Sequence, residues 1–402
     1  MSAPPVYANV PPPPPIHARS AILVDADTGQ ILYWHNANWE LPMASTTKLM
    51  TAILFCEKVS PDTIVTAGQD AASTGQCSMH LKLGEKLTAH DLLRGMLLRS
   101  ANDAAVAAAD AAAGSVPNFV KLMNAEAVAL GCYHTHFANP NGLTAPDHYT
   151  TARDLSVIAR AAMLVSRIRH VVRLKEAVIH RSIDQYDLVM RNHTHFVGFY
   201  KGANGIKTGW TDPAGHCLVG SASRNGWDLI SVVLHDRNFA KDTMALMNYG
   251  FKYFKPVTIK PADTYSGSAV VADGQKREVP LVTDAPVRVI ELKSDPLPVH
   301  TKLVMDRLTA PVSTGEIAGH EDVYEGNMLV DSIGLSANST DLALNSDKSS
   351  IAMLPAFAEK LVIVAGILVS LGYGTRIIKI AKSARRRWSG VQKGLRGDHR
   401  SG

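Results

Sequence analysis

The chain has 402 residues, a net charge of +5, a hydrophobic fraction of 46% and a charged fraction of 19%. This length is sufficient for two globular domains, and the composition fits folded domains with some membrane-like sequence. The positive charge is concentrated in seven Lys and Arg residues between positions 379 and 396, so the remainder is nearly neutral and we expect no nucleic-acid binding.

The first 17 residues are rich in proline, with Pro4, Pro5 and an unbroken run from Pro11 to Pro15. Such a run favours an extended polyproline conformation, so residues 1–17 are predicted to form a spacer outside any core. Met1 is not followed by a basic region and an apolar stretch, and a signal peptide is therefore not expected in this sequence.

Residues 18–255 alternate between strand-like and helix-like segments. Apolar runs at 20–25 and 30–34 flank Ala26-Asp27-Thr28-Gly29, which predicts a hairpin. An alanine-rich stretch from Asn102 to Ala113 predicts a helix, and the runs 214–223 and 227–234 predict two buried strands. Strands at both ends with helices between them indicate an α+β domain.

Residues 256–337 have a different character. Short β-rich runs, such as 287–290 and 301–305, alternate with Pro, Gly and Asp turns. This pattern predicts a small all-β domain, followed by a polar linker over residues 338–350.

The last part of the chain combines an apolar stretch with a basic tail. Residues 361–375 carry no charge, but these 15 residues are fewer than the about 20 that span a bilayer comfortably. Three arginines and Trp388 follow at 385–388. We expect residues 351–388 to anchor the protein in the membrane, spanning it or lying along it, with 389–402 as a polar tail on the cytoplasmic side and residues 1–350 outside.

Cysteine and histidine spacings do not predict a metal site. Cys56, Cys77, Cys132 and Cys217 form no zinc-binding pattern, and free, mostly buried thiols are expected. Two H-x-H pairs, at 134–136 and 193–195, lack a third ligand at a helpful spacing. These spacings therefore predict no metal site.

A Ser-Thr-Thr-Lys sequence at 45–48 follows Pro42 and opens a predicted helix, with Pro42 in the first turn. Positions i and i+3 of a helix share a face, so Ser45 and Lys48 would project together. A serine hydroxyl needs a base to take its proton, and a lysine of lowered pKa can be that base. By itself this short motif is weak evidence, because it occurs by chance in many chains.

Two further motifs supply what this nucleophile requires. Ser100-Ala101-Asn102 follows Ser45 by 55 residues, and Lys207-Thr208-Gly209 follows Ser100 by 107. Ser100 can relay a proton to a leaving amine, and Asn102 can hold the substrate backbone or orient Lys48. Lys207 and Thr208 offer a charge and a hydroxyl for a terminal carboxylate, while Gly209 allows the substrate backbone to approach closely.

In this order the three motifs resemble the penicillin-recognising serine acyl-transferases. Longer segments resemble the low-molecular-mass penicillin-binding proteins that are serine-type D-alanyl-D-alanine carboxypeptidases. These segments are Pro42–Lys48, Ser100–Ala104, Asn139–Leu143, Ala152–Leu155, Gly205–Thr211 and Asn248–Phe251.

The resemblance implies a β-lactamase/transpeptidase-like catalytic domain, with an antiparallel sheet and a helical cluster, at 18–255. It also implies a β domain at 256–337, a C-terminal anchor, and a place on the extracytoplasmic face of a bacterial membrane. The implied reaction removes the terminal D-alanine from peptidoglycan pentapeptides through an acyl-enzyme on Ser45, and β-lactams would acylate the same serine. The resemblance implies neither a metal nor an organic cofactor. The implied oxyanion hole is formed by the N–H groups of Ser45 and Trp210, and Trp210 stands where the family often has His or Tyr.

Three alternatives share these motifs. A β-lactamase on the same scaffold generally needs an additional glutamate, and Glu126 and Glu176 are the only glutamates between Asn102 and Lys207. An endopeptidase that cuts cross-links would use the same residues. A peptidoglycan-binding scaffold without catalysis would retain the sequence but have a blocked cleft.

Overall fold

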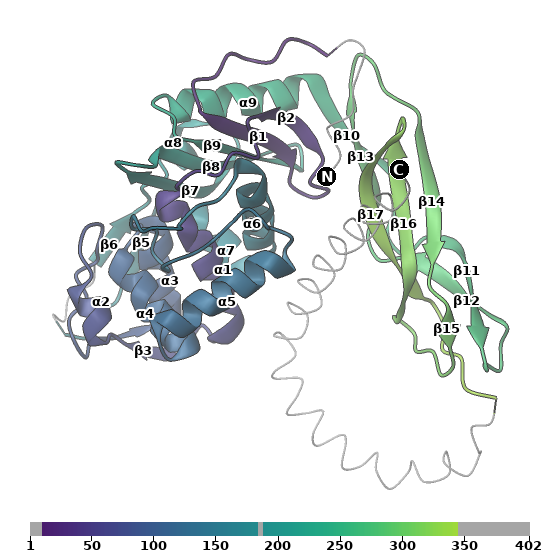
Figure 1. Cartoon of the computed structure of the whole chain (residues 1–402), viewed down its shortest axis with the longest axis horizontal. Coiled ribbons are helices and arrows are strands. Elements are labelled where there is room, and N and C mark those ends of the chain that lie inside the picture. The colour runs from purple at the N-terminus through teal and green to yellow at the C-terminus, as the bar shows by residue number, and fades with distance from the viewer. Residues whose placement is uncertain (1–9, 184–187, 345–402) are drawn as a thin grey trace, which may run out of the picture. The chain divides into compact units, whose positions relative to one another are not determined.

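The computed structural model describes residues 10–183 and 188–344 (Figure 1). The chain divides into two compact units, which meet along the sequence between Lys255 and Pro256. Each unit has its own sheet and core and is described by itself.

The first unit is built on a five-stranded antiparallel sheet with the strand order β2-β1-β9-β8-β7. The predicted hairpin and the two predicted buried strands are confirmed, and β7, which carries the Lys-Thr-Gly motif, is an edge strand. The strands are β1 (Ser20–Asp25), β2 (Ile31–His35), β7 (Ala203–Thr211), β8 (Gly215–Arg224) and β9 (Trp227–Leu234).

Helices cover both faces of this sheet. The helix α9 (Phe239–Tyr253) lies along one face and contacts β8 and β9, and a larger group of helices gathers on the other face (Figure 1). The elements of that group are η1 (Ala44–Thr47), α1 (Lys48–Lys58), α2 (Gln69–Ser73), α3 (Ala89–Leu98), α4 (Asn102–Ala113), α5 (Val116–Ala129), α6 (Ala152–Leu164) and α7 (Ser166–Val172). The short helix α8 (Phe196–Phe199) contacts β7.

The alanine-rich helix α4 has the predicted bounds and lies at the centre of the helical group. Its first eight residues, Asn102 to Ala109, are all buried, and α1, α2, α3 and α5 pack around it. Alanine side chains allow such close packing and also favour helix. The helix ends at Gly114, whose φ of 76° is the left-handed conformation that glycine adopts readily.

The helix that carries the first motif begins later than its sequence predicts. Pro42 lies outside the helix, because Met43 is the N-cap of η1 and the regular α1 begins only at Lys48. Leu41 is held instead in an isolated β-bridge with Thr150. The expectation that Pro42 occupies the first helical turn was therefore wrong.

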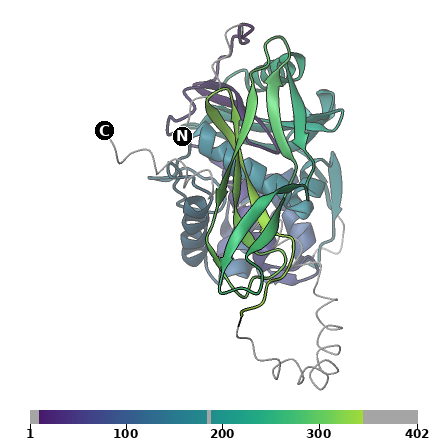
Figure 2. The same cartoon turned by 90° about the vertical axis from the view of Figure 1, so that its right-hand side faces the viewer.

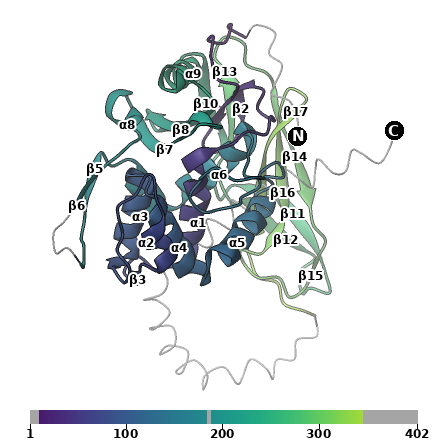
Figure 3. The same cartoon turned by 60° about the vertical axis from the view of Figure 1, so that its left-hand side comes forward.

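Two small two-stranded antiparallel sheets flank the helical group. The strands β3 (Ile64–Thr66) and β4 (Lys86–Thr88) form one of them. The strands β5 (Glu176–Ile179) and β6 (Leu188–Arg191) form the other, which projects beside α3 (Figure 3).

The second unit is a β domain, as expected for residues 256–337 (Figure 2). Its six-stranded sheet has the order β14-β16-β17-β12-β11-β15, and a separate pair joins β10 to β13. Apolar clusters around Leu281 and Val323 form its core. The strands are β10 (Phe254–Lys260), β11 (Tyr265–Ala272), β12 (Glu278–Thr283), β13 (Val287–Leu292), β14 (Val299–Met305), β15 (Leu308–Thr309), β16 (Ile317–Glu325) and β17 (Met328–Ala337).

The predicted anchor at 351–388 and the tail at 389–402 lie outside the described residues. Among the residues that are described, no helix combines the length and the apolar character needed to cross a membrane. The described part of the predicted linker bonds to the β domain, since Asp341 and Val312 exchange backbone hydrogen bonds. The described part of the proline-rich segment contacts α9, where the Tyr249 hydroxyl donates to the Pro11 carbonyl.

Candidate active site

Ser45 and Lys48 lie on either side of the junction between η1 and α1. Their Oγ and Nζ atoms are 2.9 Å apart, so the predicted shared face is confirmed. Lys48 is completely buried, whereas Ser45 is partly exposed. A substrate can therefore reach the hydroxyl, while the amine behind it is shielded from water.

Lys48 Nζ is surrounded by oxygen atoms that can satisfy either its neutral or its charged form. Lys48 Nζ donates to Asn102 Oδ1 at 2.7 Å and also to the backbone carbonyl of Asn141. Both of these oxygens can only accept. A neutral amine has two hydrogens for them and one lone pair left, which can accept the hydroxyl proton of Ser45.

The pKa of Lys48 is consistent with this protonation state. Burial lowers the pKa well below the usual 10.5, and the nearby charge of Lys207 lowers it further. A lysine whose pKa is lowered in this way can act as a general base near neutral pH.

Lys207 and Ser100 form a second polar group. Lys207 Nζ donates to Ser100 Oγ at 2.9 Å and to the carbonyl of Thr208 at 2.8 Å. Burial lowers the pKa of Lys207 to about 7. Ser100 has a φ of +64°, a left-handed conformation that is uncommon outside glycine and that occurs at functional sites.

Two glycines allow the segments around Ser45 to approach each other closely. A side-chain carbon on Gly209 would lie 2.9 Å from the Ser45 nitrogen, so only glycine lets β7 pass this close to the nucleophile. A side-chain carbon on Gly142, whose φ is +89°, would lie 2.0 Å from the Ala44 carbonyl oxygen. Ala44 itself has a positive φ of 47°. The turn that presents Ser45 is therefore enclosed by backbone on two sides.

Asp103 organises a loop beside the site, and sequence reasoning gave this residue no role. Its carboxylate accepts hydrogen bonds from Ser78 Oγ (2.6 Å) and from the backbone N–H groups of Met79 (3.1 Å) and Leu81 (3.0 Å). Asn102 also contacts this loop, because its side-chain N–H donates to the Gly75 carbonyl at 3.2 Å. That bond leaves Asn102 Oδ1 facing Lys48. The only sequence signal was the position of Asp103 directly after the Ser-Ala-Asn motif.

His148 stabilises the turn that carries Ser45, a role that sequence reasoning did not predict. Its Nδ1 accepts from the Ala138 N–H at 3.0 Å, so its Nε2 carries the hydrogen and donates to Thr47 Oγ1 at 2.8 Å. Thr47 in turn donates to the Ala44 carbonyl at 2.8 Å. Burial lowers the pKa of His148 to about 4, so the ring is neutral at physiological pH.

The structure thus brings the predicted residues into two linked groups. One group contains Ser45, Lys48 and Asn102, and the other contains Ser100 and Lys207. They are linked by charge, because Lys207 lowers the pKa of Lys48 in addition to the effect of burial. Thr208 is partly exposed on the edge strand, and the side chain of Trp210 is 58% exposed.

The two H-x-H pairs lie in different surroundings. His134 contacts Glu40, whereas His193 contacts Arg99 and is close enough to Lys207 for that charge to lower the pKa of His193 further, after burial. Within residues 10–183 and 188–344, no group of three His, Cys, Asp or Glu side chains could hold a metal ion. The four cysteines are free. Cys132 and Cys217 are buried as expected, but Cys77 is exposed.

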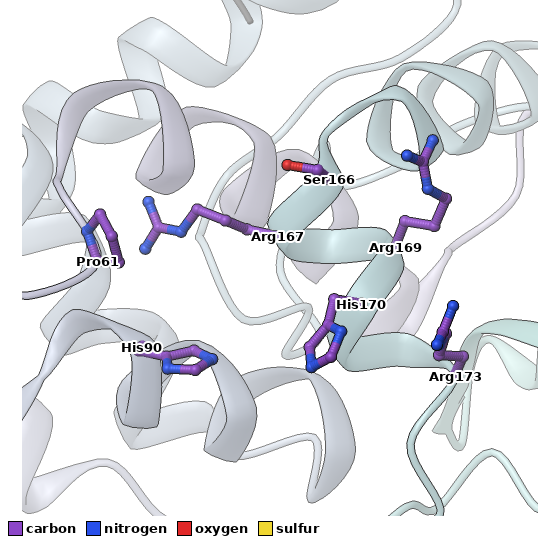
Figure 4. Close-up of a pocket in the computed structure, with 7 residues that line it drawn as sticks. All are labelled: Pro61, His90, Ser166, Arg167, Arg169, His170 and Arg173. Atoms are coloured by element: carbon purple, nitrogen blue, oxygen red, sulfur yellow. The ribbon is translucent and has the colours of Figure 1, made fainter. Parts of the chain in front are cut away.

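A basic surface hollow lies at the C-terminal end of α1 and contains none of the predicted site residues (Figure 4). In it, Arg167 Nη1 donates to the Val59 carbonyl at 2.7 Å, which ties α7 to the end of α1. This contact gives Arg167 a structural role. The lining residues are Pro61, His90, Ser166, Arg167, Arg169, His170 and Arg173.

Two family profiles match the chain. The profile of peptidase family S11, D-alanyl-D-alanine carboxypeptidase, matches residues 7–238. The profile of the penicillin-binding protein 5 C-terminal domain matches residues 254–343.

Individual relatives agree with these profiles. D-alanyl-D-alanine carboxypeptidase DacF of Bacillus subtilis is 31% identical over 314 residues, which cover 75% of this chain and 80% of that protein. DacC of Escherichia coli is 34% identical over 331 residues, which cover 77% and 80% respectively. The crystal structure of penicillin binding protein 5 from Haemophilus influenzae superposes with a TM-score of 0.66 at 27% identity, covering 82% of this chain and 99% of that one.

Proposed function

The chain belongs to the D-alanyl-D-alanine carboxypeptidases of peptidase family S11, and from this premise we propose that Ser45 carries out their reaction here. The protein removes the terminal D-alanine from peptidoglycan stem pentapeptides through a serine acyl-enzyme. The observation that carries the assignment of Ser45 is its contact with Lys48, a fully buried lysine whose other partners are both acceptors.

In the first half of the reaction, Ser45 Oγ attacks the carbonyl carbon of the penultimate D-alanine. Lys48 takes the hydroxyl proton as the new C–O bond forms, and the carbonyl oxygen becomes an oxyanion. We assign the stabilisation of this oxyanion to the backbone N–H groups of Ser45 and Trp210. Gly209 supports this assignment, because it brings β7 against the Ser45 nitrogen.

The leaving D-alanine then needs a proton on its nitrogen. Ser100 is placed to donate its hydroxyl proton and to recover one from Lys207, with which it already shares a hydrogen bond. The proton that Lys48 took from Ser45 replaces the one that Lys207 gave, so Lys48 is neutral and Lys207 is charged again before the second half of the reaction. The C–N bond breaks, free D-alanine departs, and the peptide remains as an ester on Ser45. Water then attacks this ester with Lys48 as the base, which releases the shortened peptide and restores the serine.

Recognition of the C-terminal end is assigned to Lys207 and Thr208. A charged Lys207 attracts the terminal carboxylate of the substrate, and the Thr208 hydroxyl donates a hydrogen bond to it. β7 is an edge strand, so its outer backbone groups are available to an extended peptide. β-Lactams acylate Ser45 because they resemble the D-alanyl-D-alanine end.

One set of incubations separates this function from its alternatives. The purified protein is given a stem pentapeptide, a cross-linked peptide dimer and a penicillin in separate reactions. We expect release of D-alanine from the pentapeptide and slow turnover of penicillin. Fast penicillin turnover without release of D-alanine would indicate a β-lactamase. Cleavage of the cross-linked dimer alone would indicate an endopeptidase. If none of the three compounds were turned over, the protein would be a binding scaffold.

The pH dependence of kcat/KM should show two limbs. Lys48 must be neutral to act as a base, so activity rises as pH increases through its pKa. Lys207 must be charged to hold the carboxylate, so activity falls as pH increases through its pKa, below the ordinary lysine value of 10.5.

The variant Lys207→Arg tests the assignment of the alkaline limb. A guanidinium stays charged throughout this range, so the alkaline limb should disappear while the acidic limb remains. An alkaline limb at an unchanged pH in Lys207→Arg would show that Lys207 is not its source.

We also propose that the protein acts outside the cytoplasm and is held at the membrane by residues 351–388. The apolar stretch and the basic, Trp-containing segment that follows it support this anchor. Truncation after Ser350 should move the protein from the membrane fraction to the soluble fraction of cells, as detected by immunoblotting. An unchanged distribution would exclude this segment as the anchor.

A further inference from the structure

The basic hollow lies at the opposite end of α1 from the nucleophile. Ser45 precedes the start of α1 at Lys48, whereas Pro61, which lines the hollow, follows the end of α1 at Lys58. An α-helix of these 11 residues is about 16 Å long. The hollow has a volume of about 470 Å³, within the roughly 300–1,000 Å³ of small-molecule sites. It is therefore a separate place where a small ligand could bind.

The hollow is built from three segments that hydrogen bonds hold together (Figure 4). The N–H of His90, the second residue of α3, donates to the Pro61 carbonyl at 3.0 Å. Arg167, on α7, donates to the Val59 carbonyl. The walls are thus fixed by the fold, so a ligand would not have to order them on binding.

One face of α7 turns a row of polar side chains toward the hollow. Ser166, Arg169, His170 and Arg173 stand at positions i, i+3, i+4 and i+7, which lie on the same side of a helix. All four of these residues are exposed. Together with Arg167, this row brings three guanidinium groups to one concave surface.

No carboxylate neutralises these guanidinium groups within residues 10–183 and 188–344. Arg169 Nη1 donates to the Met163 carbonyl at 3.1 Å, so its partner is uncharged backbone. Arg167 Nη1 also bonds to backbone, and its Nε and Nη2 atoms have no partner in the described part of the chain. Arg173 makes neither a hydrogen bond nor an ion pair there. The positive charge of the hollow is therefore uncompensated.

The two acids that are close to the hollow in sequence leave this charge in place. Asp91 is already bonded to Arg94 and His180. Asp62 is exposed and does not line the hollow. The pKa of His90 reflects the excess of positive charge: burial lowers it most, and Arg94 lowers it by more than Asp91 raises it.

The chemistry of the hollow suits a phosphate group. A phosphate monoester carries up to two negative charges and three acceptor oxygens. The parallel N–H groups of an arginine bind such oxygens in pairs, and a concave surface lined by one sign of charge attracts the opposite sign strongly. The Ser166 hydroxyl adds one further donor at the rim.

From these observations we infer that the basic hollow is a binding site for a phosphate-bearing ligand, held by Arg169, Arg173 and Ser166. The phosphate could belong to a free diphosphate or to the phosphodiester headgroup of a lipid, and the experiment below distinguishes the two. The inference does not depend on the proposed function, because it uses none of the residues around Ser45.

Calorimetric titration of the full-length protein in a non-ionic detergent tests the site. The two probes are inorganic pyrophosphate and glycerophosphoglycerol, the soluble headgroup of phosphatidylglycerol, at constant ionic strength and near neutral pH. We expect saturable binding, and the tighter probe identifies the source of the phosphate. The pair Arg169→Gln and Arg173→Gln should weaken that binding by at least about tenfold. Arg173→Gln alone, which removes no described hydrogen bond, should weaken it by about threefold to fivefold.

A matched control removes two exposed arginines elsewhere. The Arg19 N–H donates to the His235 carbonyl, so Arg19 lies close to Arg237. The pair Arg19→Gln and Arg237→Gln changes the net charge equally and should keep the affinity within about twofold. Absence of saturable binding for both probes, an equal loss in the control pair, or binding of citrate as tight as that of pyrophosphate would overturn the site. Every variant should release D-alanine at the wild-type rate, so the proposed function is tested separately.

Discussion

The variant Ser45→Ala is expected to show no covalent labelling by a fluorescent penicillin under conditions that label the wild type completely. The acyl bond needs the Ser45 oxygen, and an alanine has no atom to replace it. The side chain is small and partly exposed, so its removal should leave the fold intact. Labelling is read from a denaturing gel, and the melting temperature should match that of the wild type.

A second variant tests Cys77 as a competing nucleophile near the site. Cys77 is an exposed free thiol whose charge would be felt by both Lys48 and Lys207. Cys77→Ala should label like the wild type. Penicillin bound covalently to Ser45→Ala, and lost in Cys77→Ala, would transfer the nucleophile role to the thiol.

The second large effect is expected for Lys48→Met, which keeps a similar volume but removes the amine. Loss of a general base typically costs about 10²- to 10⁴-fold in rate. We expect the rate constant for acylation by penicillin to fall by about 10³-fold, since the hydroxyl proton then has no acceptor in the site. Stopped-flow or manual labelling time courses measure this constant directly.

The stability of Lys48→Met separates a chemical effect from a folding defect. Replacing the fully buried Lys48 by Met removes the cost of burying an ionisable group, but it also leaves the Asn102 and Asn141 oxygens without their donor. These two effects oppose each other. The variant should therefore melt no more than a few degrees below the wild type. Acylation within tenfold of the wild-type rate would show that another group accepts the proton.

The two lysines of the site have the same side chain but different expected charges. Lys48 is enclosed by acceptors that a neutral amine satisfies, with its lone pair left for Ser45. Lys207 bonds to Ser100 and to the Thr208 carbonyl, and it borders the position where a carboxylate would bind. A bound carboxylate would favour the charged form of Lys207, and that charge helps to keep Lys48 neutral.

The sequence was sufficient to predict the elements whose signal is local. Helix α4 has the predicted bounds because its alanine run fixes both its conformation and its close packing. The strands β8 and β9 were found because they are apolar and joined by an Asn-Gly turn. The start of the Ser45 helix was misplaced at Pro42, because a tertiary bridge between Leu41 and Thr150 holds the chain extended there.

The parts that could not be predicted depend on contacts between distant segments. The Asn141 carbonyl reaches Lys48 across 93 positions, and His148 reaches Thr47 across 101. Neither residue has a spacing that reveals its partner. The closeness of Gly142 to the Ala44 carbonyl likewise becomes visible only in three dimensions.

The most direct measurement of the central claim is the location of the acyl group. The protein is mixed with a stem-peptide ester that ends in D-alanyl-D-lactate, whose good leaving group lets the acyl-enzyme accumulate, and the reaction is stopped with acid. Peptide mapping by mass spectrometry should find the acyl peptide, without its terminal lactate, on the fragment that contains Ser45. Release of lactate with an unmodified Ser45 fragment, or with the acyl group on another residue, would contradict the mechanism.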